Sequence, residues 1–190
     1  MWKISIFVPE LTEAGSKTPL FYSTFIHMDT SEKEYIARLV NEIIAGFERE
    51  DLFLVEVIFR KGKRSAIHIL ADTDTGISLK ECVSISRKLG ALLEEDPEFQ
   101  FPYTLEVSSP GLDRPFLLKR QYAKNVGRAL RVVLKTGEVH EGVLTAVRDN
   151  DFDLKVTIKK EKVSSLIPVS FDTLKEAKVV ISFKHTLIEE

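Results

Sequence analysis

Residues 103–115 read YTLEVSSPGLDRP, and they separate two halves of the sequence that differ in character. The first six residues alternate between apolar and polar side chains, which is typical of a strand with one buried face. The rest of the stretch contains Pro110, Gly111 and Pro115. Proline restricts the backbone angle φ, and glycine can take a positive φ where a chain turns sharply. The stretch therefore predicts a strand followed by a stiff linker over residues 108–115.

Two helices are expected in the half before the linker. Apolar residues recur at helical spacing over residues 32–50, directly after the sequence SEKE at 31–34. The sequence SLKE at 78–81 precedes a second amphipathic pattern that runs to about residue 96. Both tetrapeptides match the capping box, in which a serine hydroxyl and a glutamate each accept a hydrogen bond from a free backbone N–H group.

Strands fill the gaps between these helices. Residues 52–59 and 65–71 are rich in β-branched and aromatic side chains and flank a basic turn, so they predict a hairpin. Together with the strand at 103–108 they give the order α-β-β-α-β, and we expect two helices on one face of a three-stranded sheet over residues 30–111. Residues 1–29 match neither period well, and we expect an accessory or poorly ordered arm, or an upstream start that the cell does not use.

The half after the linker is different, because only strands follow a short helical segment near residues 119–125. Five strands are expected, at 129–134, 138–147, 152–158, 162–168 and 178–183. Short strands with tight polar turns favour a small closed barrel, since closure removes exposed sheet edges. The fold class is therefore α+β, with a two-layer domain at 30–111 and a small all-β domain at 112–190.

Composition and charge limit the function. Of the 190 residues, 44% are hydrophobic and 29% charged, as in ordinary soluble proteins. The sequence has no run of about 18 apolar residues, so no membrane span is predicted. The N-terminal apolar run is too short for a secretory signal, and the single cysteine fits a reducing compartment. We therefore expect a cytoplasmic protein. Residues 30–111 hold 10 Lys and Arg against 15 Asp and Glu, a net −5, whereas residues 112–190 hold 15 against 11, a net +4. A basic half can follow a nucleic-acid backbone and an acidic half can meet a basic protein, although both can equally be solvated surfaces.

Catalytic and metal-binding patterns are weak. The four histidines are widely separated, and with Cys82 they make no zinc pattern. Asp72, Asp74 and Glu81 lack the spacing of a calcium-binding EF-hand loop. Cys82 stands at helical spacing among apolar residues and is expected in the core. We therefore expect no enzyme, no cofactor, no metal and no small-molecule substrate; a hydrolase that uses the Asp72/Asp74 loop is the least favoured alternative.

Basic residues supply candidate contacts with RNA, because lysine and arginine neutralise phosphates. They gather at the hairpin turn, after the linker and between two barrel strands, and each group can also be a solvated turn. No aromatic RNA-reading motif and no Gly-x-x-Gly loop is visible, so sequence-specific recognition is not expected. The candidates are Lys61, Lys63, Arg64, Arg114, Lys119, Arg120, Lys124, Arg128, Lys159 and Lys160.

The segment at 105–115, LEVSSPGLDRP, resembles the signature of the ribosome maturation factor RimP family. Further similar positions are Asp72-x-Asp74-x-Gly76-Ile77, Asp96-Pro97 and Tyr122-x-x-x-Val126-Gly127. The resemblance extends over roughly residues 35–185, and this chain departs from the family pattern in its long N-terminal arm.

The resemblance implies an N-terminal α/β domain and a C-terminal barrel of the Sm or SH3 type. It also implies a non-catalytic, cytoplasmic assembly factor that binds the immature 30S ribosomal subunit through its rRNA and a basic ribosomal protein. The charge difference suggests that the acidic half meets the protein and the basic half meets rRNA, although the barrel can equally be the protein-binding half. A monomer is expected; the competing hypothesis is a general Sm-like RNA-binding regulator that oligomerises through a free strand.

Two interpretations of the linker remain open. Its residues can act purely as a hinge that fixes the angle between two domains, or they can also contact RNA or protein directly. In the second interpretation the direct contacts are Ser108, Ser109 and Arg114. The linker as a whole consists of Ser108, Ser109, Pro110, Gly111, Leu112, Asp113, Arg114 and Pro115.

Overall fold

The computed structural model describes residues 3–8, 28–158 and 163–180 of the chain. The chain forms two compact units, Met1–Pro110 and Gly111–Glu190. In the described part of the chain, no helix is both long enough and apolar enough to cross a membrane.

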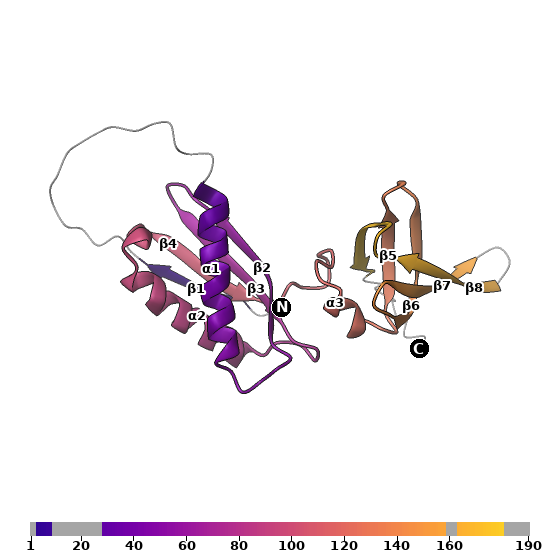
Figure 1. Ribbon diagram of the computed structural model, residues 1–190, viewed down its shortest axis with the longest axis horizontal. Helices are drawn as coiled ribbons and strands as arrows, with labels where there is room; N and C mark the ends of the chain where they lie inside the picture. The colour runs from indigo at the N-terminus through magenta and orange to yellow at the C-terminus, as the bar shows by residue number, and fades with distance from the viewer. Residues whose placement is uncertain (1–2, 9–27, 159–162, 181–190) are drawn as a thin grey trace, which may run out of the picture. The chain divides into compact units, whose positions relative to one another are not determined.

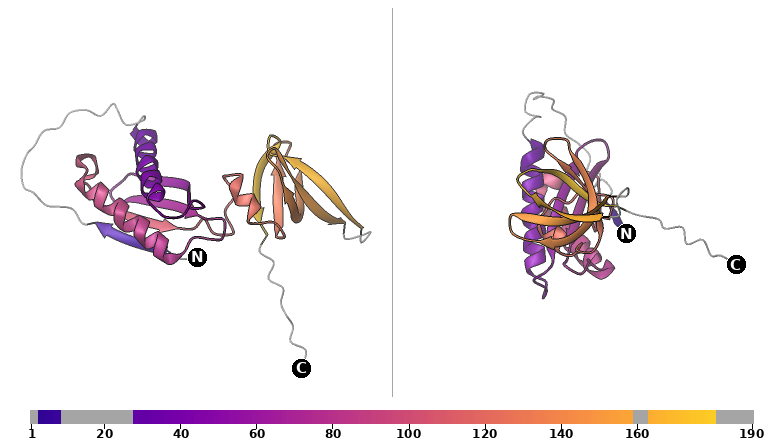
Figure 2. Two further views of the ribbon diagram at one scale, coloured as in Figure 1. Left: turned by 60° about the horizontal axis from the view of Figure 1, so that its bottom comes forward. Right: turned by 90° about the vertical axis from the view of Figure 1, so that its right-hand side faces the viewer.

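The first unit is a four-stranded sheet with helices on one face (Figure 1). Its elements in chain order are β1 (Lys3–Val8), α1 (Met28–Ala45), β2 (Phe53–Arg60), β3 (Ser65–Asp72), α2 (Leu79–Glu95), the 3₁₀ turn η1 (Pro97–Phe99) and β4 (Tyr103–Ser108). The strand order is β1-β4-β3-β2, and only the β3–β4 pair is parallel. Because α2 connects the two parallel strands, it must cross over the sheet, and it packs beside α1 (Figure 2).

Alternate residues of the strands build the core of this unit. Ile67 and Ile69 of β3 and Leu105 and Val107 of β4 are fully buried, and they pack against the apolar stripes of both helices. The opposite residues of β3 and β4 point to the other face of the sheet. One such residue is His68, whose Nδ1 lies 3.6 Å from Oε2 of Glu106 on the neighbouring strand.

Two sequence-based expectations for this unit are wrong. The sheet has a fourth strand, β1, which lies in the segment expected to be an accessory arm and pairs antiparallel with β4; residues 9–27 of that segment lie outside the described residues. The helix α1 begins at Met28, so the capping-box sequence at 31–34 lies inside it and does not start it. It ends at Ala45, directly before Gly46, a residue that is unfavourable inside helices.

The second capping box is confirmed. The Ser78 hydroxyl accepts a hydrogen bond from the backbone N–H of Glu81, and the Glu81 carboxylate accepts one from the backbone N–H of Ser78. Both bonds satisfy N–H groups that the helix itself leaves free, and they fix the first residue of α2.

The second unit contains a short helix and a five-stranded antiparallel sheet. Its elements are α3 (Arg120–Ala123), β5 (Ala129–Leu134), β6 (Val139–Val147), β7 (Asp151–Ile158), β8 (Val163–Ser170) and β9 (Leu174–Val179), and the strand order is β8-β7-β6-β5-β9. Its core includes an aromatic cluster in which the Tyr122 ring lies 4.8–5.1 Å from the rings of Phe116, Phe152 and Phe171. Four of the five expected strands correspond to β5 to β8, but the fifth, expected at 178–183, is found at 174–179, and residues 181–183 lie outside the described residues.

Candidate functional site

Two of the three sequence segments that carry the family resemblance in the first unit meet at one edge of its sheet. Strands β3 and β4 run parallel, and Leu70 is paired with Ser108. The loop at 72–76 and the linker that starts at Ser108 therefore leave the sheet at the same, carboxyl edge. In open α/β sheets, ligands bind outside the carboxyl ends of the parallel strands.

Arg49, which sequence reasoning missed, ties this edge together. Its guanidinium donates to both carboxylate oxygens of Asp51, at 2.5 and 3.0 Å, and to Oε1 of Glu81, at 2.7 Å. It also donates to the hydroxyl oxygens of Thr73 and Thr75, at 3.2 and 2.8 Å. We call these five residues the Arg49 cluster. One planar side chain thus joins the segment after α1, the loop after β3 and the first turn of α2.

The electrostatics of the Arg49 cluster keep its carboxylates charged. Hydrogen bonds from Arg49 hold the pKa of Asp51 below its usual value. Burial alone would raise the pKa of Glu81, but hydrogen bonds from Ser78 and Arg49 outweigh burial and lower it. Both carboxylates in turn raise the pKa of Arg49. The cluster is therefore a set of mutually satisfied charges.

The linker begins as an extension of the carboxyl edge. Ser108 and Pro110 are buried and Ser109 is half-buried. The next residue, Gly111, opens the second unit with a φ of 78°. The expected positive φ at this glycine is confirmed. The remaining linker residues differ in exposure: Leu112, Asp113 and Pro115 are exposed and Arg114 is half-buried.

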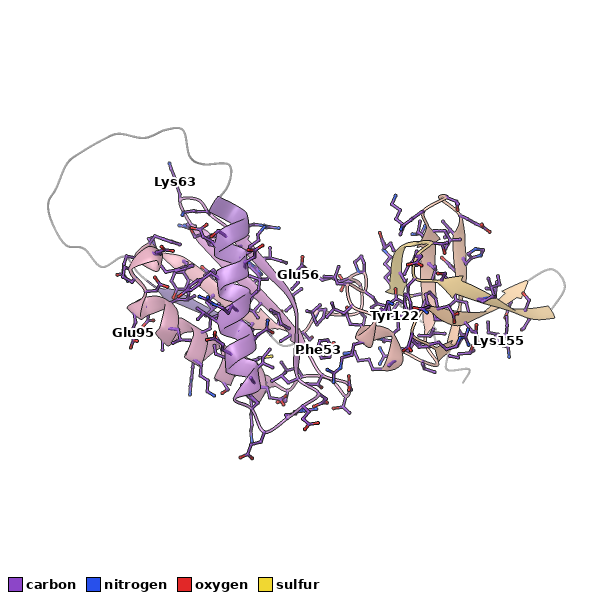
Figure 3. All side chains as sticks on the ribbon, viewed as in Figure 1. Phe53, Glu56, Lys63, Glu95, Tyr122 and Lys155 are labelled. Atoms are coloured by element: carbon purple, nitrogen blue, oxygen red, sulfur yellow. The ribbon has the colours of Figure 1, made fainter. Side chains whose placement is uncertain are left out.

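The basic hairpin turn lies at the other end of the sheet. Figure 3 shows Lys63 at one end of the β2–β3 hairpin and Phe53, which is paired with Asp72, at the opposite end. Strand β3 has eight residues, so roughly 25 Å separates the turn from the loop at 72–76. The structure does not bring these two candidate regions together.

Two of the candidate contact residues, Lys61 and Lys119, already have partners within the protein. Lys61 is paired with Glu32, with 2.7 Å between Nζ and Oε1, and its Nζ lies 5.4 Å from the centre of the Phe101 ring. Lys119 donates to the carbonyl oxygen of Asp149 at 2.8 Å and its Nζ lies 5.0 Å from the centre of the Phe171 ring. These two side chains have structural roles within their own units.

The other candidates are sorted by exposure. Lys63, Arg64, Arg120 and Arg128 are exposed and Lys124 is half-buried. Lys159 and Lys160 lie outside the described residues. Within the described part of the chain, His, Cys, Asp and Glu residues form no group of three or more that could hold a metal ion.

Comparison with known proteins gives one family-model match and relatives that are similar over most of the chain. Residues 39–113 match the family model of the RimP N-terminal domain, which includes the Arg49 cluster and the start of the linker. The chain is similar to the ribosome maturation factor RimP of Cytophaga hutchinsonii, with 35% identity over 165 residues that cover 80% of this chain and 95% of that protein. It is also similar to the ribosome maturation factor RimP of Chlorobium phaeobacteroides, with 32% identity over 163 residues that cover 82% of this chain and 91% of that protein. The chain therefore belongs to the RimP family.

Proposed function

We propose that this chain is a ribosome maturation factor that binds the immature 30S subunit during assembly, through rRNA and a basic small-subunit protein, and acts without catalysis. The observation that carries the proposal is the extent of the similarity. It covers 80% and 82% of the chain and nearly the whole of two proteins named for ribosome maturation, so it includes both units.

The Arg49 cluster supports a binding role. Its hydroxyl and carboxylate oxygens accept hydrogen bonds from one arginine. Such a network holds a loop and a helix end in one arrangement, which a protein needs when it presents a fixed surface to a large partner.

The second proposal concerns the second unit, whose sheet would also suit a binding role as a closed barrel. We infer that it forms a small barrel of the Sm or SH3 type, with the protein in the cytoplasm as a monomer. Support comes from its antiparallel strands of six to nine residues and from Gly142, where the backbone of β7 approaches β6 too closely for a side chain.

Sedimentation tests the proposal. A lysate of the native organism is run on a sucrose gradient in low salt, and the chain is detected with an antibody. We expect it to travel with free small subunits and to leave them at high salt, because phosphate contacts weaken as salt rises. A chain that stays at the top of the gradient in low salt, or travels with large subunits, contradicts the proposal.

A variant distinguishes the two interpretations of the linker. Arg114→Ala should reduce the fraction that travels with small subunits only if the linker contacts the subunit directly, and the unfolding midpoint of the variant is measured beside it to separate lost contact from lost stability. Lys175→Ala, on the exposed surface of β9, is the matched control.

The alternative, an Sm-like regulator that oligomerises, has one structural argument. Strands β8 and β9 stand at the two ends of the second sheet, and Leu166 of β8 is 63% exposed. A free strand edge can pair with another chain. Gel filtration at micromolar concentration distinguishes the two possibilities. A monomer excludes the alternative, and a ring of several copies of the chain supports it.

A further inference from the structure

The outward face of α2 carries a group of basic residues that the sequence reasoning did not use. The residues that α2 buries include Cys82, Ile85, Leu89 and Leu93. On the opposite side, Lys80, Arg87 and Lys88 are exposed at spacings of seven and eight residues, with Ser84 between them. The three cations therefore share one face of the helix.

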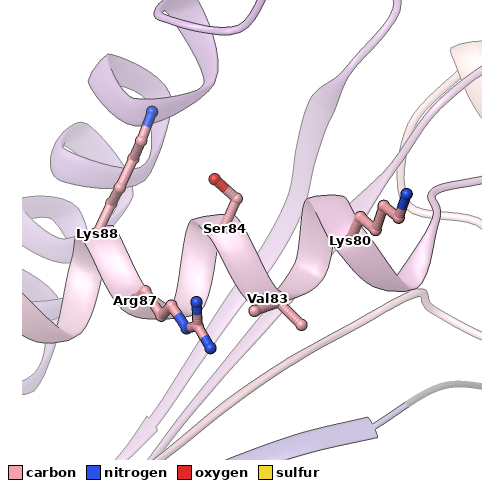
Figure 4. Close-up of a pocket in the computed structure, with 5 residues that line it drawn as sticks. All are labelled: Lys80, Val83, Ser84, Arg87 and Lys88. Atoms are coloured by element: carbon pink, nitrogen blue, oxygen red, sulfur yellow. The ribbon is translucent and has the colours of Figure 1, made fainter.

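These side chains surround a hollow in the surface. An open pocket of about 430 Å³ is lined by Lys80, Val83, Ser84, Arg87 and Lys88 (Figure 4). Lys88 extends toward the neighbouring helix, where its Nζ lies 4.9 Å from the centre of the Phe47 ring. The floor between the cations is uncharged, and the Ser84 hydroxyl can donate a hydrogen bond to a bound oxygen.

The contact with the Phe47 ring gives Lys88 a structural role, but no such contact explains Lys80 and Arg87 among the described residues. Among the described residues, no carboxylate forms an ion pair with Lys80, Arg87 or Lys88. Lys80 stands in the first turn of α2 and Glu94 and Glu95 in the last. The helix macrodipole disfavours a cation at the first position and anions at the second, so the charges oppose the helix that carries them. They also stand in the acidic half of the chain, which makes a local concentration of cations more unusual.

We propose that this face of α2, which we call the α2 basic face, binds the phosphate backbone of RNA. Lys80 and Arg87 are about 10 Å apart along the axis, since a helix rises ~1.5 Å per residue. A nucleic-acid strand carries a phosphate at every nucleotide, so one strand can place a phosphate at each of these two cations. The face thus matches a short stretch of backbone and reads no base, because it offers no aromatic side chain on which a base could stack.

RNA fits this face better than an acidic protein segment does. The anionic groups of a nucleic acid repeat at short, regular intervals along one strand, whereas peptide carboxylates sit on long side chains whose ordering costs entropy. The acidic residues in the last turn of α2 repel a polyanion that continues along the helix, so a bound strand must turn away from the helix beyond Arg87. The inference deepens the proposed function, because rRNA is the RNA that such a factor would meet.

Fluorescence anisotropy with the full chain tests the proposal. The probe is a fluorescein-labelled, 20-nucleotide single-stranded RNA of mixed sequence, titrated at several salt concentrations between 50 and 200 mM. The variant is Lys80→Gln/Arg87→Gln, and the control is Lys135→Gln/Lys175→Gln, which makes the same change in charge at exposed positions of the second unit.

We expect the α2 variant to bind roughly tenfold more weakly and its plot of log affinity against log salt to lose about 1.4 units of slope, or 0.7 per phosphate contact. The control should keep the wild-type slope. An α2 variant with wild-type affinity and slope overturns the proposal. Circular dichroism checks folding, which should be unharmed because the change removes a charge that opposes the helix dipole.

A second probe separates the two kinds of partner. A fluorescein-labelled peptide of twenty glutamates is titrated under the same conditions. If it depends on Lys80 and Arg87 while the RNA does not, the α2 basic face binds acidic protein and the proposal is wrong. The sucrose gradient separates a failure of this inference from a failure of the proposed function. If Lys80→Gln/Arg87→Gln binds RNA normally and still travels with small subunits, only this inference is wrong. If the wild-type chain binds RNA but never travels with small subunits, only the proposed function is wrong.

Discussion

Replacing Gly142 with alanine should destabilise the second unit, because the strand β6 has no room for a methyl group at this position. A Cβ atom on Gly142 would lie 2.7 Å from the carbonyl oxygen of Lys155 and 3.0 Å from Cγ2 of Val156. Gly142 is paired with Leu130 of β5, and the next residue is paired with Lys155 of β7. The closest atom belongs to the backbone, so a side-chain rotation cannot relieve the contact.

The cost follows from how far the backbone must move. Ordinary contacts of a Cβ atom are 3.4 Å or longer, so the β6 and β7 backbones must separate by several tenths of an ångström. Inserting a methyl group into a well-packed site costs about 1–3 kcal/mol. For a unit of this size that corresponds to a fall in melting temperature of about 4–8 °C per kcal/mol.

Hydrogen exchange measured by mass spectrometry can follow the two units of the full chain separately. Peptides from β5, β6 and β7 should exchange roughly 5- to 150-fold faster in Gly142→Ala, the factor that 1–3 kcal/mol gives where exchange requires unfolding. Peptides from the first unit should be unchanged. Gly62→Ala is the control, because no atom lies within 4 Å of a Cβ at that position. Wild-type exchange rates over β6 and β7 in Gly142→Ala would show that β6 has room for a methyl group at this position.

Three further perturbations concern the first unit. Because the pKa values of Asp51 and Glu81 are lowered in the folded chain, these carboxylates stabilise the fold above the usual carboxylate pKa range, and this contribution is lost as pH falls through their folded pKa values. Arg49→Met should therefore lower the urea concentration at the unfolding midpoint by more at pH 7 than at pH 3. An equal decrease at both pH values would contradict this prediction. Burial raises the pKa of Tyr103 to about 12, so above pH 10 the unfolded chain loses this proton before the folded chain does, and the folded state becomes less stable as pH rises toward 12. Tyr103→Phe should therefore resist alkaline unfolding better than the wild type. Because the buried hydroxyl has no hydrogen-bond partner among the described residues, Tyr103→Phe should be as stable as the wild type or up to ~1 kcal/mol more stable at pH 7, which a thermal melt would check. Ser78→Ala should cost about 1 kcal/mol by removing the cap of α2, and Ser78→Gly less; equal stability of Ser78→Ala and wild type in urea would contradict the capping role.

Local patterns predicted the elements whose signals lie within a few residues. The box at Ser78 and Glu81 starts α2 as expected, because the residues before it form a loop. The same pattern at 31–34 was misleading, because the three preceding residues are already helical. A tetrapeptide does not reveal what precedes it, so capping boxes are reliable only where a loop is established independently.

The features that could not be predicted from the sequence, the strand β1 and the contacts of Arg49, depend on partners that lie far away along the chain. Residues 3–8 form a strand through pairing with β4, which lies about a hundred positions later, and a six-residue run gives no hint of that partner. Arg49 was missed for the same reason, because its partners come from three separate segments. The α2 basic face, by contrast, was available from helical spacing alone, since its cations stand opposite the apolar stripe.

The pairing of β1 with β4 has a consequence for synthesis of the chain. The first strand leaves the ribosome long before its partner exists, because Lys3 is paired with Ser108. At ~5–20 residues per second, about 5–20 s of elongation separate the two. During that interval β1 is an unpaired peptide, and the sheet gains its outer strand only after the rest of the first unit has been made.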